Sequence, residues 1–226
     1  MYSLLSPAPQ KNTLVLLSGG LDSATVLALA RKNTTEKLYT LSFDYGQKLI
    51  RELDNVKKLA EFYDATSLIR SASALEGLRG LRSTDAVTGK PPAPSLLPDS
   101  WKPGRNMVFL AIALSYAYDL GCSIVAGGMH QEDYPGYPDC RGEFLQRMSE
   151  AGAYALATPT DLWIPFLYHN KAQIVKVGLD LEVPYELTWS CYKGGDKPCR
   201  ECDACVRREQ AFQANGLVDP LLTEVS

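Results

Sequence analysis

The sequence has few histidines and no surplus of basic residues. Its 226 residues include two histidines, and 23 Lys and Arg residues stand against 26 Asp and Glu residues, which gives a formal net charge of −3. Proteins that bind duplex nucleic acid without sequence preference usually carry excess positive charge. We therefore expect no nucleic-acid partner.

Long hydrophobic runs are also missing. The longest, residues 107–118, spans about 12 residues and includes Ser115, whereas a helix needs about 20 apolar residues to cross a bilayer. Residues 1–11 contain no basic patch followed by an apolar run, so we expect no secretory signal. These absences predict a cytoplasmic, globular protein with no membrane partner.

Cysteines are scarce except near the C-terminal end. Four of the six are Cys191, Cys199, Cys202 and Cys205, separated by seven, two and two residues. In a reducing compartment such a cluster indicates a metal site and not disulfides. Four thiolates satisfy tetrahedral Zn²⁺ completely, which predicts a structural zinc knuckle. An iron–sulfur cluster uses the same ligands and stays an alternative.

Strand and helix patterns alternate along most of the chain. This alternation predicts an α/β fold with a parallel sheet covered by helices. Residues 71–104 are rich in proline and predict an ordered loop on the substrate side. We expect a main domain over 1–182 and a zinc-binding appendage over 183–226, packed on the same domain. The predicted strands are 13–17, 37–43, 66–70 and 123–127, and the predicted helices are 23–32, 51–63, 105–120, 142–154 and 171–181.

Residues 18–23, Ser-Gly-Gly-Leu-Asp-Ser, lie between a predicted strand and a predicted helix. Glycines let the backbone approach a phosphate, and a helix start offers unpaired N–H groups and a positive dipole end. The pattern therefore predicts a phosphate site. Because a carboxylate repels phosphate, we expect Asp22 to hold Mg²⁺ or to orient the loop.

The same loop differs from two common nucleotide motifs. No Walker A Lys-Ser or Lys-Thr pair follows the glycines, and the third glycine of a dinucleotide fingerprint is absent. The loop instead resembles the PP-loop of ATP pyrophosphatases, which cleave ATP between its α and β phosphates to adenylate an oxygen. That resemblance predicts a reaction type but no particular substrate.

Further segments extend this resemblance from residue 14 to residue 222. Together with the PP-loop and the cysteines, their order and spacing resemble the QueC family of queuosine biosynthesis, the 7-cyano-7-deazaguanine synthases. The segments are SFDYGQ at 42–47, PGRN at 103–106, YPDCR at 137–141, NKAQIV at 170–175 and LTWSCY at 187–192.

The resemblance implies a fold and a chemistry. The fold would be adenine-nucleotide α-hydrolase-like (HUP/PP-loop) with a zinc appendage, in a homodimer. The enzyme would be an ATP-dependent ligase that adenylates 7-carboxy-7-deazaguanine, forms the amide with ammonia, adenylates the amide and releases the nitrile. Its cofactors would be ATP, Mg²⁺ and Zn²⁺.

The resemblance also implies roles for particular residues. It implies a catalytic set of Asp22, Ser23, Arg105 and Lys171. It implies an ATP-binding set of Leu16, Ser18, Gly19, Gly20, Leu21, Asp22, Ser23 and Phe43. It implies that the substrate is bound by Arg105, Asn106, Tyr137, Asp139 and Arg141. A carboxylate of this set would pair with the guanine-like edge of the substrate, and a guanidinium would pair with the substrate carboxylate or an ATP phosphate.

Plainer interpretations compete for several residues. Arg105 and Lys171 could be exposed helix residues, and Cys140 is expected to pack or to line the substrate site because no neighbour in sequence activates its thiol. His130 and His169 are candidates for acid–base catalysis or ordinary hydrogen-bonded residues. The basic residues near the C-terminus, Arg200, Arg207 and Arg208, predict a solvated face.

Three positions depart from the family pattern. Leu49 stands where the family has histidine, Lys102 replaces valine, and Arg200 replaces a knuckle glycine. These departures leave open a QueC-like enzyme of a bacterial defence system, which would join a deazaguanine to a protein amine and stop at the amide. A non-catalytic nucleotide-binding module and a PP-loop enzyme acting on tRNA are further alternatives. The intact loop disfavours the non-catalytic module, and the lack of surplus basic charge disfavours the tRNA-acting enzyme.

Overall fold

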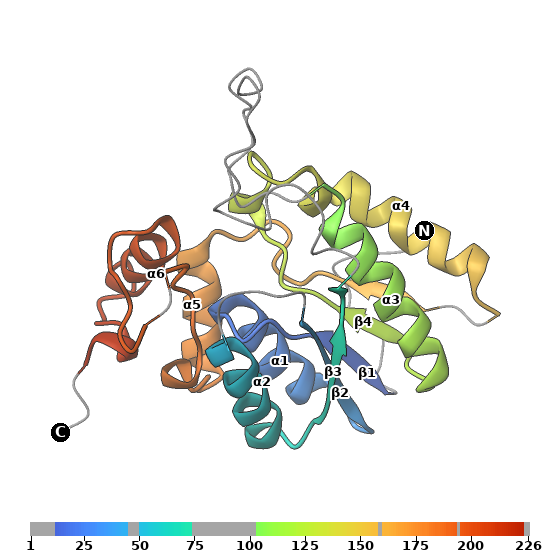
Figure 1. Cartoon of the computed structure of the whole chain (residues 1–226), viewed down its shortest axis with the longest axis horizontal. Helices are drawn as coiled ribbons and strands as arrows, with labels where there is room; N and C mark the ends of the chain where they lie inside the picture. The colour runs from blue at the N-terminus through green and yellow to red at the C-terminus, as the bar shows by residue number, and fades with distance from the viewer. Residues whose placement is uncertain (1–11, 45–49, 74–102, 158–159, 194, 224–226) are drawn as a thin grey trace.

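The structure is a computed structural model that describes residues 12–44, 50–73, 103–157, 160–193 and 195–223. The sheet has five strands in the order β3-β2-β1-β4-β5, and every neighbouring pair is parallel (Figure 1). The predicted loop at 71–104 falls mostly outside the described residues, as do Leu49 and Lys102. The strands are β1 (Thr13–Leu16), β2 (Leu38–Asp44), β3 (Thr66–Ser71), β4 (Ile124–Ala126) and β5 (Asp161–Trp163).

Helices cover both faces of this sheet, which confirms the predicted fold class (Figure 1). Neighbouring strand residues point to opposite faces, so Val15 packs into one buried cluster and Leu14 into the other. The first cluster receives residues of α1 (Leu21–Asn33), α2 (Ile50–Phe62), α5 (Lys171–Asp180) and α6 (Asp203–Gln213). The second receives residues of α3 (Arg105–Asp119) and α4 (Gly142–Ala155).

Two elements were not predicted from the sequence. β5 has three residues, too few to show a periodic pattern, and α6 begins among the cysteines and carries many charged side chains. A boundary also differs, because α1 begins at Leu21 and not at Ser23. The helix therefore starts directly after the glycines of the loop.

The C-terminal segment packs against α1 and α5. The Tyr185 hydroxyl lies 2.8 Å from Thr25 Oγ1 of α1, and the Tyr185 ring meets Phe212 of α6 edge-on at 5.3 Å. Gly178 of α5 makes room for this tyrosine, because a Cβ there would lie 1.8 Å from the Tyr185 hydroxyl. The chain after residue 183 thus shares a core with the helices around the sheet.

The prediction of a solvated face is wrong for one of the three C-terminal arginines. Arg208 is 2% exposed and forms a bidentate ion pair with Asp219, with N–O distances of 2.7 and 3.0 Å. It also donates to the Tyr185 carbonyl and to Thr188 Oγ1. The charge is tolerated inside because every side of the guanidinium meets an acceptor.

The strand order places a reversal point between β1 and β4. The chain runs outward from β1 through β2 to β3 and then crosses back to β4 and β5. In open parallel sheets, ligands bind outside the carboxyl ends of the strands at such a point. No helix in the described residues is long and apolar enough to cross a membrane.

Candidate functional site

The loop between β1 and α1 is held by its own serines. Ser23 Oγ donates to the Gly20 carbonyl at 3.0 Å, accepts from the Ser18 N–H at 3.2 Å and lies 3.1 Å from Ser18 Oγ. Gly19 has a φ of 83°, which side chains disfavour. The main-chain N–H of Trp189 donates to the Gly19 carbonyl at 2.9 Å, so the C-terminal segment also braces the loop.

The first turn of α1 has no side-chain cap. Its N-cap residue is Gly20, and the N–H groups of the first turn lie at the carboxyl end of β1. Unpaired N–H groups and the helix dipole together make an anion site. The loop therefore has the geometry that the sequence predicted for a phosphate site.

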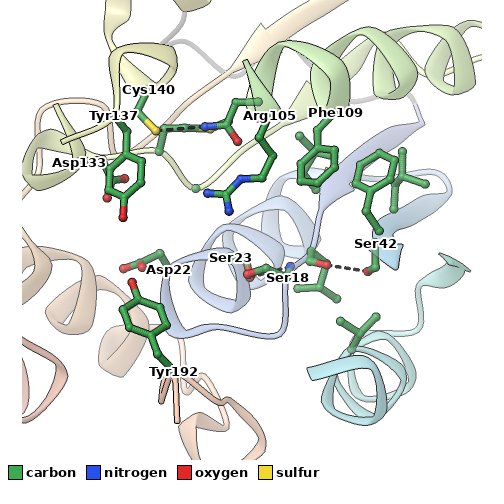
Figure 2. Close-up of a pocket in the computed structure, with 18 residues that line it drawn as sticks. Ser18, Asp22, Ser23, Ser42, Arg105, Phe109, Asp133, Tyr137, Cys140 and Tyr192 are labelled. Atoms are coloured by element: carbon green, nitrogen blue, oxygen red, sulfur yellow. Dashed lines mark hydrogen bonds between the residues drawn. The ribbon is translucent and has the colours of Figure 1, made fainter. Parts of the chain in front are cut away.

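A cavity of about 370 Å³ opens beside this loop (Figure 2). That volume is within the range of small-molecule sites. The cavity has the loop and the start of α3 in its walls, with Phe43 and Phe109 stacked at 4.2 Å between ring centroids. Of the residues assigned to ATP, those that line it are Leu16, Ser18, Asp22, Ser23 and Phe43, while Gly19, Gly20 and Leu21 form the adjoining turn.

Asp22 lies at the centre of a charged network. Lys171 Nζ is 3.0 Å from Asp22 Oδ2, and His130 Nε2 is 3.7 Å from the same oxygen. Burial alone would raise the pKa of Asp22, but Lys171 and His130 outweigh it and lower the pKa below its usual range. Asp22 is therefore an anion, and its buried Oδ1 atom has no hydrogen-bond partner in the part of the chain that the structure describes.

His130 is buried and its ring orientation is fixed. Its Nδ1 accepts from the Glu132 N–H at 3.3 Å, which leaves the Nε2 proton facing Asp22 and Asp133. Burial would lower the pKa of His130, but the two carboxylates raise it overall. His169 has a buried Nδ1 without a hydrogen-bond partner and packs edge-on against Phe166.

Arg105 projects into the cavity from the first turn of α3. Figure 2 shows its guanidinium pointing toward Ser23 and Ser18. Within the described part of the chain, it forms no ion pair or hydrogen bond with a protein group. A free cation beside an uncapped helix start favours a bound anion between them.

The five residues assigned to substrate separate into two groups. Arg105, Asn106 and Tyr137 line the cavity, whereas Asp139 and Arg141 do not. Asp139 is 8% exposed, and its Oδ2 accepts the Asn106 N–H at 2.9 Å, so it caps the start of α3. Arg141 is exposed and donates to the Tyr134 carbonyl.

Several lining residues were missed from the sequence. Asp133 lies beside Tyr137 at one end of the cavity with Tyr192 on the opposite side, and Phe109 lies at the other end (Figure 2). Asp133 follows β4 in a short 3-10 turn, where no periodic pattern marks a side chain as functional. The weak signal available was its position just after the carboxyl end of a central strand.

Cys140 also lines the cavity, which agrees with the expectation that it packs or lines the substrate site. It is 6% exposed and accepts from Asn106 Nδ2 at 3.2 Å. Burial, with the nearby Asp133 and Asp139, raises the pKa of its thiol far above the usual value. A thiol held in the protonated form is a poor nucleophile.

The four C-terminal cysteines come together. Their sulfur atoms all lie within 4.8 Å of one another, although the four residues come from a loop and the start of α6. The Cys199 N–H points at Cys191 Sγ and the Cys202 N–H at Cys199 Sγ, as in a metal knuckle. The donor set and its compactness fit one tetrahedral ion or a small cluster.

Arg200 has a backbone conformation that favours glycine. Its φ is 62°, in the left-handed region, and its guanidinium pairs with Glu209 at 2.8 Å. The departure from the family pattern therefore places a strained residue in the turn of the knuckle.

Comparison with curated proteins gives close relatives of one kind. A Thermoplasma volcanium protein is 41% identical over 225 residues, which cover 93% of this chain and 90% of the relative. An Oceanobacillus iheyensis protein is 39% identical over 217 residues, covering 93% and 97%. Both are named 7-cyano-7-deazaguanine synthase, and the prediction of a synthase-type enzyme is confirmed.

Solved structures share the fold at low sequence identity. NMN synthetase from Francisella tularensis is 19% identical with a TM-score of 0.52, covering 92% of this chain and 79% of that one. The U34-tRNA thiolase NcsA from Methanococcus maripaludis, solved with its [4Fe-4S] cluster, is 16% identical with a TM-score of 0.51, covering 94% and 68%. These likenesses support the PP-loop type of fold.

The family model described as queuosine biosynthesis protein QueC matches residues 12–216, a range that contains the loop, the cavity and all four clustered cysteines. On that match and the identities above, the chain belongs to the QueC family.

Proposed function

We propose that this protein adenylates 7-carboxy-7-deazaguanine with ATP and converts it, through the amide, into 7-cyano-7-deazaguanine. One observation carries the proposal: a single cavity joins an uncapped helix start, a guanidinium that no described residue pairs, and a second end lined by polar side chains. Membership of the QueC family supports the choice of substrate.

ATP would bind with its phosphates at the loop. The N–H groups of the first turn of α1 are oriented for anionic oxygens, with the Ser18 hydroxyl as a further donor. The Gly20 N–H donates to Ser18 Oγ and the Ser23 hydroxyl to the Gly20 carbonyl, so these two groups hold the loop in shape. The adenine would lie toward Phe43 and Phe109, whose stacked rings form the apolar end of the cavity. With ATP bound in this way, its α phosphate would lie near the middle of the cavity.

The first half-reaction transfers AMP to the substrate carboxylate. A carboxylate oxygen attacks the α phosphorus, the bond to the bridging oxygen breaks, and pyrophosphate leaves. Arg105 stabilises charge on the transferring phosphate, and Lys171, held by Asp22, neutralises the leaving pyrophosphate. Positioning and charge compensation are the protein's main contributions.

The second half-reaction forms the C–N bond. Ammonia attacks the acyl carbon, AMP departs with one carboxylate oxygen, and loss of a proton leaves the amide. A second ATP then adenylates the amide oxygen, and loss of AMP and a proton from nitrogen gives the nitrile. Two ATP molecules are consumed for each nitrile.

Magnesium would be held at Asp22. Among the described residues the buried Asp22 Oδ1 atom has no hydrogen-bond partner, which fits a hard cation that prefers carboxylate oxygen. When bound, the ion would neutralise the pyrophosphate oxygens.

Zinc would be held by Cys191, Cys199, Cys202 and Cys205. A four-sulfur site leaves no position for water, so its role is structural. Metal analysis of the purified protein separates zinc from an iron–sulfur cluster. The homodimer stays a prediction, which light scattering coupled to size exclusion tests.

Mass spectrometry of the products tests the proposed function. The protein is incubated with ATP, Mg²⁺, 7-carboxy-7-deazaguanine and ammonium. The expected products are AMP, pyrophosphate and the nitrile. An amide that accumulates would favour conjugation to another amine, and absence of AMP would overturn the adenylation itself.

A further inference from the structure

The polar end of the cavity contains a carboxylate that the family motifs do not include. Asp133 lies there with Tyr137 and Tyr192, while Arg105 projects between this end and the Phe43–Phe109 end (Figure 2). The cavity is thus divided into an apolar end and an acidic, aromatic end on either side of the phosphate loop.

One oxygen of Asp133 is committed and the other is free. Oδ2 accepts the His130 N–H at 3.2 Å and lies 3.6 Å from His130 Nε2. Within the described residues, Oδ1 has no protein partner, although the side chain is only 28% exposed. A half-buried carboxylate oxygen without a donor favours a ligand that supplies one.

The walls beside Asp133 suit a planar ring. Tyr137 and Tyr192 come from opposite sides of the cavity, one from the turn before α4 and one from the cysteine segment (Figure 2). Aromatic faces on two sides favour a flat heterocycle.

We infer that Asp133 is the specificity-determining residue of the acceptor site and pairs with the amino and imino N–H edge of a guanine-like base between Tyr137 and Tyr192. This inference rests on the proposed function. That edge lies on the opposite side of the fused ring from the 7-substituent. A base read by Asp133 therefore directs its carboxylate toward Arg105 and the phosphate loop.

The assignment moves this role from Asp139 to Asp133. Asp139 caps α3 through the Asn106 N–H and does not line the cavity. Its carboxylate is already used by the protein, whereas Asp133 presents an oxygen to the cavity. Asp133 is four positions from the cavity residues Met129 and Tyr137, and Asp139 is next to Cys140, so the sequence does not separate the two carboxylates.

The test compares Asp133→Asn with Asp139→Asn. The asparagine at 133 can still accept the His130 N–H but presents an N–H₂ group, a donor, to the base. Rates of AMP release are measured with 7-carboxy-7-deazaguanine and with its analogue that lacks the 2-amino group. Thermal unfolding and the KM for ATP are measured for each variant.

The wild type should prefer the full substrate by at least about tenfold in kcat/KM, the effect of a carboxylate pairing with two donors. Asp133→Asn should lose that preference through a higher KM for the base, with the KM for ATP unchanged. Asp139→Asn should lower thermal stability and keep the preference.

Three results would contradict the inference. Loss of the preference in Asp139→Asn alone would return the role to Asp139. A higher Mg²⁺ requirement in Asp133→Asn, with the preference kept, would make Asp133 a cation ligand. A wild type that releases AMP equally with both bases would remove the base-reading role alone, whereas a wild type that releases none with either would overturn the proposed function.

Discussion

The carboxylate of Asp22 lies at the start of α1 between a lysine and a histidine that come from distant parts of the chain. Its place in the loop was evident from the Ser-Gly-Gly-Leu-Asp-Ser pattern. Its partners were not, because Lys171 and His130 meet it only through the packing of α5 and the turn after β4. A single sequence gives no direct signal for such contacts.

Replacing Asp22 should abolish adenylation and preserve the fold. Asp22→Asn keeps the shape of the side chain but removes the charge that holds Lys171 and a cation. We expect AMP formation to fall by at least about 100-fold, the usual effect of losing a main electrostatic group. Asp180→Asn is the control, because its pairing with Lys176 is exposed on α5. Normal AMP formation in Asp22→Asn would refute the loop assignment.

Arg208 should matter for stability and not for chemistry. Arg208→Met leaves Asp219 buried without its partner, which should lower the free energy of unfolding by about 3–5 kcal/mol. Urea unfolding followed by circular dichroism measures this change. Arg207→Met, about half exposed, should change stability by less than about 0.5 kcal/mol. Equal effects of the two substitutions would show that the buried pair is not as tight as described.

The regular elements of the sheet could be predicted because their patterns are long or strongly apolar. Strand β1 is an almost continuous apolar run, four of the seven residues of β2 are apolar, and α2 shows an amphipathic repeat. The clustering of the four cysteines could be predicted from their spacing alone. β5 and α6 could not, since three residues show no period and the apolar face of α6 is interrupted by the buried Arg208.

The knuckle turn offers a test of backbone strain. Arg200 has a positive φ, so a glycine should be better tolerated there than an alanine, and neither keeps the Glu209 ion pair. We expect Arg200→Gly to be more stable than Arg200→Ala by about 1 kcal/mol. At Gln210, which is exposed in α6, the alanine variant should instead be more stable than the glycine variant by about the same amount. Thermal unfolding of the four variants checks both signs. Equal thermal stability of Arg200→Ala and Arg200→Gly would contradict the strained backbone at this turn.

The metal cluster and the phosphate loop meet through one short segment. Trp189 donates its main-chain N–H to Gly19 and its indole N–H to the Cys191 carbonyl at 3.1 Å. The sequence indicated both sites but gave no sign that they touch. Their contact depends on how the C-terminal segment packs on α1 and α5.

Removing one cysteine should therefore lower the yield of soluble protein more than it lowers the activity of the protein that stays soluble. Cys202→Ser breaks the four-sulfur set, and we expect lower metal content and a lower yield of soluble protein, measured by elemental analysis and by fractionation of the lysate. Cys122→Ala, buried away from the cluster, should keep its metal. A Cys202→Ser protein that is stable without metal would contradict the structural role.

The hydrogen bond from Trp189 to Gly19 also sets an order of events during synthesis. The tryptophan that braces the glycine turn follows Gly19 by 170 positions, so it leaves the ribosome long after β1 and the turn. A nascent chain therefore carries an unbraced turn until residue 189 has emerged. Nucleotide should protect full-length chains from protease but not truncated ones that end before the tryptophan.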